Sequence, residues 1–178
     1  SREGIIQRIN SDLANDFGNL AQRVLSMINK NCDGQVPEPG DFSAEDDALL
    51  AGVTNLLAEM RDAFDVQAFH IALEKMWFHI RAANAYIDHQ APWTLRKEDP
   101  ARMATVLYAL GEVIRRLGIL AQPFMPGSAA KMLDQLAVPE DGRGFASLAD
   151  DIRWPAGTEL PKPEGVFPRH VEEEAAAE

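Results

Sequence analysis

Residues 99–123 read DPARMATVLYALGEVIRRLGILAQP, and this stretch decides the fold of the chain. Asp99 and Pro100 mark a helix start, because an Asp side chain caps free backbone amides and proline suits the first helical position. Pro123 marks the end, since proline lacks a backbone donor and breaks a helix. The apolar residues between them recur every three or four positions, which predicts a helix with one buried face. These residues are Met103, Val106, Leu107, Leu110, Ile114, Leu117 and Leu120.

The same spacing occurs in three earlier segments. A first helix is predicted over about residues 3–31, where the apolar positions step by three or four. A second begins after Ser43, because the Ser-Ala-Glu-Asp sequence there is a capping box with an acidic first turn. A third begins after Asp65 and ends near Gln90, because Pro92 disfavours helical geometry in the residue before it.

A short fifth helix is predicted to open at Pro126, and the helical pattern ends near Val138. Proline and glycine then interrupt every period, so residues 139–178 are predicted to form an extended arm with an acidic tail. The arm keeps large apolar side chains, which a freely disordered linker would lack, and we expect it to dock on the bundle or on another domain. No strand-like alternation is present. The sequence therefore predicts an all-α fold, a bundle of about five helices in residues 1–138 followed by the arm.

The chain is acidic, with a net charge of −11 and a pI near 4.8. On its own this opposes a nucleic-acid partner, because binding phosphates requires Lys and Arg. The acids, however, concentrate in residues 38–65 and from Asp134 onward, and several basic residues lie outside these segments. A local basic face on an acidic protein is therefore compatible with the sequence. The basic residues concerned are Arg23, Lys30, Arg81, Arg96, Lys97, Arg102, Arg115 and Arg116.

Several classes of function have no support in the sequence. Cys32 is the only cysteine and four histidines are scattered, so neither a disulfide within the chain nor a zinc cluster is predicted. No Gly-rich phosphate loop and no Cys-His or Ser-His-Asp spacing is present, so we expect no catalytic residue and no metal site. No apolar run approaches the ~18 residues of a membrane span, and no signal peptide is visible. The single cysteine fits a reducing compartment, so we expect a cytoplasmic protein. The chain starts at Ser1 without an initiator methionine, and we expect it to be a fragment of a longer protein.

Two polar residues of the first predicted helix are candidates for recognition. Asn19 and Arg23 lie four positions apart, so they project from the same face, one turn apart. One interpretation is a solvated Asn beside an Arg paired with an acid such as Asp16. The alternative is that both side chains point to a base edge, because Asn offers a donor and an acceptor and Arg offers a rigid fork of donors.

Trp93 follows Pro92 at the predicted exit of the third helix, and two interpretations of this loop tryptophan stay open. The indole either caps the bundle core or forms a partly exposed platform on which an unstacked base can rest. Arg96 and Lys97 come directly afterwards. They are candidates for contacting the backbone phosphates of the same nucleic-acid loop.

Three segments resemble a known family. Residues 9–23 read INSDLANDFGNLAQR, similar to the opening helix of the anticodon-binding domain of bacterial-type, class I methionyl-tRNA synthetases. Residues 83–93 read ANAYIDHQAPW, similar to the segment that carries the anticodon-reading tryptophan of this family. Residues 162–169 read KPEGVFPR, which resembles the C-terminal end of the shorter bacterial enzymes. The first two motifs are specific at this separation, and the third is short and supportive.

The resemblance implies an α-helical bundle that recognises the CAU anticodon of tRNA-Met. In the family the matching Asn and Arg contact the first anticodon base and the matching Trp stacks on the anticodon, which implies these roles for Asn19, Arg23 and Trp93. The family's arm folds back toward the catalytic domain. The catalytic motifs, the methionine pocket and the ATP site of the family are absent from this sequence. The resemblance therefore implies recognition without chemistry, while the parent enzyme joins methionine to tRNA using ATP.

The partners implied are the anticodon loop of tRNA-Met and the catalytic domain of the same polypeptide, with no cofactor in this chain, no membrane and a monomeric state. Two rival interpretations stay open. The first is an anticodon domain from a related class I synthetase, such as one for Ile, Val, Leu or Cys. The second is a helical protein-interaction module, which the acidic surface and the apolar arm support. Turnover by the isolated chain would instead indicate a stand-alone enzyme.

Overall fold

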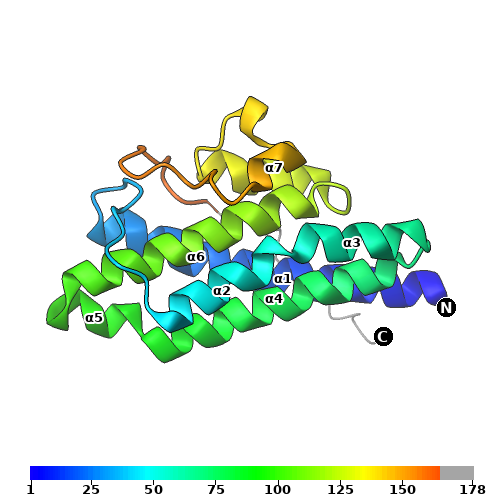
Figure 1. Ribbon diagram of the computed structural model, residues 1–178, viewed down its shortest axis with the longest axis horizontal. Coiled ribbons are helices and arrows are strands. Elements are labelled where there is room, and N and C mark those ends of the chain that lie inside the picture. Colours follow the sequence, from blue (N-terminus) through cyan, green and yellow to red (C-terminus); the bar gives the residue numbers. More distant parts are fainter. Residues whose placement is uncertain (165–178) are drawn as a thin grey trace, which may run out of the picture.

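The computed structural model describes residues 1–164, which form a helical bundle (Figure 1). All five predicted helices are present, so the predicted all-α class is confirmed. Over these residues the α-helices are α1 (Arg2–Asn31), α2 (Ala44–Thr54), α3 (Leu56–Asp65), α4 (Phe69–Gln90), α5 (Pro92–Glu98), α6 (Pro100–Ala121) and α7 (Pro126–Gln135). Two short 3-10 helices follow, η1 (Glu140–Gly142) and η2 (Phe145–Leu148).

Helix α6 lies at the centre of the bundle. The long helices α1 and α4 run in the same direction, and α6 returns in the opposite direction (Figure 1). Residues 105–121 of α6 are all buried, because α1, α2, α4, α5, α7 and the arm pack around this helix. The apolar stripe in the sequence predicted a single buried face. The opposite face is buried as well, because it carries the small Gly111 and is covered by the arm.

The second predicted helix is divided into two. Its start is as predicted, because the Ser43 hydroxyl accepts from the Asp46 amide while the Asp46 carboxylate accepts from the Ser43 amide. The helix is interrupted at Asn55, where α2 ends and α3 begins. The apolar stripe continues across this break, so Val53 and Met60 are both buried in the common core.

A single residue turns the chain between α4 and α5. Ala91 adopts a left-handed backbone, with φ of 46°, and Pro92 takes the first helical position of α5. The expectation that Trp93 lies in a loop is wrong, because this one-residue turn lets the chain re-enter a helix with Trp93 in its first turn. Proline supports this arrangement, since its fixed φ suits a helix start.

The described part of the arm, residues 139–164, runs over α6 and beside α7 (Figure 1). The indole of Trp154 is 1% exposed and lies so close to Gly111 that a Cβ there would be 2.1 Å from Cζ3. Its Nε1 donates to the Leu136 carbonyl oxygen at 2.9 Å, and the Tyr108 hydroxyl donates to the Trp154 carbonyl oxygen at 2.7 Å. Docking of the arm therefore requires glycine at this position of α6.

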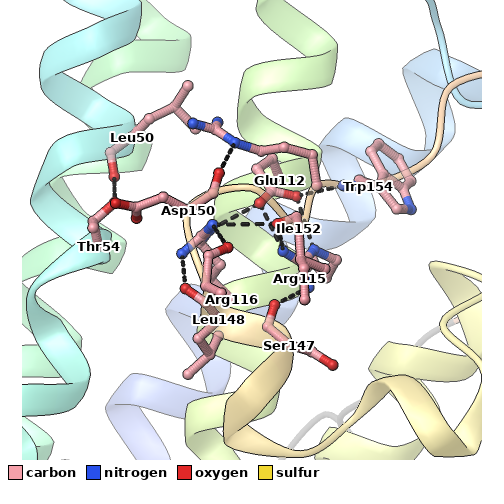
Figure 2. A network of polar contacts seen from close by, with 12 residues as sticks. Leu50, Thr54, Glu112, Arg115, Arg116, Ser147, Leu148, Asp150, Ile152 and Trp154 are labelled. Atoms are coloured by element: carbon pink, nitrogen blue, oxygen red, sulfur yellow. Dashed lines mark hydrogen bonds and ion pairs between the residues drawn. The ribbon is translucent and has the colours of Figure 1, made fainter.

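A buried charge network also ties the arm to α6 (Figure 2). The fully buried Glu112 carboxylate accepts from Arg115 and Arg116, each at 2.8 Å, and from the Trp154 backbone amide at 2.9 Å. The two guanidinium groups donate in turn to backbone carbonyl oxygens of the arm, so every charge in the network has a partner. These carbonyl groups belong to Ser147, Leu148, Ala149 and Ile152.

Three arginines do not belong to the basic face that the sequence allowed. Arg115 and Arg116 are 3% and 2% exposed, because they serve Glu112 and the arm. Arg102 forms an ion pair with Asp46, which is fully buried.

The Phe-Pro-Arg ending and the acidic tail, both within residues 165–178, lie outside the described part of the chain.

Candidate nucleic-acid interface

Two rows of polar side chains face each other across the contact between α1 and α4. Asp16, Asn19 and Arg23 follow one another at intervals of three and four residues on α1, so they share one helix face. On α4 the corresponding row is Trp77, Arg81, Asn84 and Asp88, at intervals of four, three and four. Because α1 and α4 run in parallel, each row meets the other over about two helical turns.

Two polar contacts join the rows and bracket a hollow between them. At one end the Trp77 Nε1 donates to the Asp16 carboxylate at 2.6 Å. At the other end Arg23 forms an ion pair with Asp88 at 3.0 Å. Between these contacts lies an open hollow of about 550 Å³, and every residue that lines it has a polar or charged side chain. Its lining residues are Asp16, Asn19, Gln22, Arg23, Arg81 and Asn84.

The hollow brings together two of the predicted recognition residues, and the third lies at its rim. Asn19 and Arg23 line it, and the guanidinium carbon of Arg23 lies 5.6 Å from the centre of the Trp93 ring. The Trp93 side chain is 44% exposed, so the alternative in which it caps the core is wrong. Arg23 does pair with an acid, but the partner is Asp88 and not Asp16.

Arg96 and Lys97 lie on α5, three and four positions after Trp93, and share its side of this short helix. Both are exposed, and neither lines the hollow. No carboxylate within residues 1–164 forms an ion pair with either of them. The structure therefore places these two charges outside the hollow, with their donors facing solvent.

A polar network between α2, α4 and α6 holds the α4–α5 junction. Arg102 donates to the Asp46 carboxylate and to the Gln90 side chain at the last residue of α4, and the Tyr86 hydroxyl donates to Asp46 at 2.6 Å. Burial raises the pKa of Asp46, but the hydrogen bonds from Arg102, Tyr86 and the Ser43 backbone outweigh it and lower the pKa to about 2. Asp46 therefore stays ionised at neutral pH and fixes the turn that presents the α5 indole.

The α4 row was missed in the sequence, although a signal for it exists. Trp77, Arg81, Asn84 and Asp88 repeat with helical spacing, which is the pattern of a second helix face beside the apolar one. That pattern reveals a second helix face, but it does not show which helix packs against this face. Only the parallel packing of α1 and α4 shows that this row faces Asn19.

Metal sites and membrane-spanning helices are two other features that the described residues could carry. Over residues 1–164 no three His, Cys, Asp or Glu side chains are arranged to hold a metal ion. In the same part of the chain no helix combines the length and the apolarity that crossing a membrane requires.

Comparison with solved structures places the fold among aminoacyl-tRNA synthetases. The apo form of Mycobacterium tuberculosis methionyl-tRNA synthetase superposes with a TM-score of 0.87 at 50% identity, over 96% of this chain and 35% of that chain. The complex of the same synthetase with methionyl-adenylate gives a TM-score of 0.87 at 51% identity, over 94% of this chain and 33% of that chain. Brucella suis methionine–tRNA ligase is 56% identical over 97% of this chain.

Residues 36–178 match the family described as the anticodon binding domain of methionyl tRNA ligase. The chain belongs to this family of anticodon-binding domains. It spans about a third of the length of the curated relatives it matches, 33% for the Brucella suis ligase and 34% for that of Rhizobium meliloti, to which it is 52% identical.

Proposed function

We propose that this domain binds the anticodon loop of tRNA-Met and reads its CAU anticodon at the rim of the α1–α4 hollow. The first anticodon base rests on Trp93, while Asn19 and Arg23 hydrogen-bond its Watson–Crick edge. The observation that supports this most directly is that Arg23 and Asn19 line one hollow and the Arg23 guanidinium lies over the exposed Trp93 indole at its rim.

Discrimination between bases depends on whether the polar groups of Asn19 and Arg23 find partners on the bound base. A base stacked on an aromatic ring gains roughly 1–3 kcal/mol whatever its identity, so Trp93 supplies affinity. The fork of Arg23 and the amide of Asn19 offer fixed donors and acceptors, and a base of the wrong pattern leaves one of them unpaired. Each unpaired group costs roughly 1–3 kcal/mol, which is enough to select a base.

The backbone of the loop needs positive charge outside the base site. Arg96 and Lys97 are exposed on the helix that carries Trp93 and have no carboxylate partner within the described residues. We assign them to the phosphates of the anticodon loop. These contacts add affinity and salt dependence without choosing a base.

We expect a longer protein that contains this domain to carry out the catalytic reaction. The relatives are about three times as long as this chain, and they are methionine–tRNA ligases. In the whole protein we propose that a catalytic domain attaches methionine to the tRNA with ATP in the cytoplasm. The present domain requires no cofactor, acts as a monomer and is inactive alone. It supplies recognition and positioning.

The proposal is tested by titrating the chain with anticodon stem-loops. Wild type is expected to favour CAU over loops with a changed first anticodon base, and Trp93→Ala to lose about tenfold in affinity, as a lost stacking contact implies. The matched control is Phe78→Ala, because Phe78 is an exposed aromatic on α4 that does not line the hollow. Unchanged affinity and base preference in Trp93→Ala would contradict the proposal.

The same titration separates the rival functions. An anticodon domain for Ile, Val, Leu or Cys would prefer the matching stem-loop over CAU. A protein-interaction module would ignore every stem-loop.

A further inference from the structure

A second arginine–tryptophan pair lies at the Asp16 end of the hollow, away from the proposed base site. The guanidinium carbon of Arg81 is 5.1 Å from the centre of the Trp77 ring. Trp77 is half-buried and is fixed by its hydrogen bond to Asp16. Trp77 is therefore a less accessible platform for a base than Trp93, which is 44% exposed. The pair instead offers the free edge of a planar cation.

The charge of Arg81 has no carboxylate partner. Arg23 pairs with Asp88, and the Asp16 carboxylate accepts from Trp77, so the acids at the two ends of the hollow are both engaged. No ion pair within residues 1–164 includes Arg81. In a chain with a net charge of −11 an unpaired arginine held in a polar hollow is a site for an anion.

The position of Arg81 limits which anion this is. Arg81 and Asp88 are seven residues apart on α4, about 10 Å along the helix axis. The backbone of Arg81 is therefore about two helical turns from the Arg23 and Trp93 end of the hollow. A group at Arg81 belongs to a neighbouring nucleotide, and the anion that every nucleotide carries is its phosphate.

We propose that Arg81 binds a backbone phosphate of the anticodon loop, belonging to a nucleotide next to the one that rests on Trp93. This inference rests on the proposed function, and it makes the hollow a two-part site. The Trp93 end reads a base and the Trp77–Arg81 end anchors the strand. The fixed indole beneath the guanidinium limits its motion, so less freedom is lost when the phosphate binds.

The test measures stem-loop affinity at several salt concentrations for wild type, Arg81→Gln, Arg81→Lys and Lys131→Gln. Arg81→Gln is expected to weaken binding about tenfold for all first-base variants alike, and to reduce the slope of log affinity against log salt by about 0.7. Arg81→Lys is expected to keep the slope and to recover part of the affinity. Lys131→Gln removes the same charge from α7, outside the hollow, and is expected to leave the slope unchanged.

The outcomes separate this inference from the function on which it rests. If wild type prefers CAU but Arg81→Gln keeps wild-type affinity and slope, only the phosphate site is wrong. If Arg81→Gln changes the base preference and leaves the slope, Arg81 reads a base and the inference is overturned. If wild type ignores every stem-loop, the proposed function fails and the phosphate site fails with it. Thermal unfolding of Arg81→Gln close to wild type confirms that the exposed substitution leaves the fold intact.

Discussion

The domain uses arginine, a carboxylate and tryptophan in two regions with opposite environments. At the docked arm, Arg115 and Arg116 surround a buried Glu112, and Trp154 is 1% exposed. At the rim of the hollow, Arg23 and its acid partner have side chains 43% and 66% exposed, and Trp93 is 44% exposed.

The difference between these regions lies in the donors that are still available. In the arm network the guanidinium groups donate to Glu112 and to backbone carbonyl groups, so adding a ligand would break existing bonds. At the hollow Arg23 makes a single exposed ion pair and lies over an accessible ring. The same residue types therefore stabilise the fold at the arm, where they are buried and their donors are engaged. At the hollow their donors are available for the recognition that we propose.

The largest expected effect comes from Gly111→Ala in the arm region. The added Cβ would be 2.1 Å from the Trp154 ring, so the indole has to leave its site. We expect the free energy of unfolding to fall by about 3 kcal/mol or more, as for the loss of a large buried aromatic contact. Urea denaturation measures this. Gly127→Ala is the matched control, because nothing lies within 4 Å of its added Cβ. Equal stability of the two variants would contradict the tight docking of Trp154.

Acid unfolding tests the Asp46 network at the α4–α5 junction. The folded pKa of Asp46 is about 2, below its ordinary value of 3.8, so its stabilising contribution is complete above about pH 5 and is lost as the pH falls through 2. This contribution is about 2 kcal/mol. In Asp46→Asn the fall in unfolding free energy between pH 5 and pH 2 is expected to be smaller than in wild type by that amount. An equal fall in unfolding free energy in both proteins would show that Asp46 is not the group responsible.

The same Arg-to-Lys change should have different effects in the two regions. Arg23→Lys keeps the charge but loses the planar group over Trp93, so stem-loop affinity is expected to fall by about 1 kcal/mol with stability unchanged. Arg116→Lys loses donors to the arm, so stability is expected to fall by about 2 kcal/mol with affinity per folded molecule unchanged. Titration and urea denaturation of both variants check this. The comparison fails if both variants change the same quantity.

The smallest expected effect comes from Asp88→Asn. The ion pair of Asp88 with Arg23 is exposed on both sides, so its loss should change the free energy of unfolding by less than about 0.5 kcal/mol. Urea denaturation at low and high salt measures this. A loss of several kcal/mol would mean that the hollow is a structural network like the one beneath the arm.

Most of the helices could be predicted because their signals are local. The capping box at Ser43, the Asp99-Pro100 start and the Pro126 start each act within one helical turn, and the structure has each helix start there. The turn at Ala91 could not be predicted, because a left-handed alanine carries no sequence signal of the kind that glycine gives. The chain therefore enters α5 where a loop was expected.

The candidate site could be predicted only in part. The resemblance pointed to Asn19, Arg23 and Trp93, and the structure places the first two in one hollow with the third at its rim. The partners on α4 depend on how two helices pack, which no spacing within one helix reveals. The burial of Arg115 and Arg116 was missed for the same reason, since it depends on an arm that returns from more than thirty residues further along the chain.

The most direct test of this account is the fluorine NMR spectrum of the fluorotryptophan-labelled chain during titration with a CAU stem-loop. The chain has three tryptophans, Trp77, Trp93 and Trp154, which give one signal each. The account predicts a large shift for Trp93, a smaller one for Trp77 and none for Trp154. A shift of the Trp154 signal with Trp93 unchanged would contradict the assignment of recognition to the hollow and of structure to the arm.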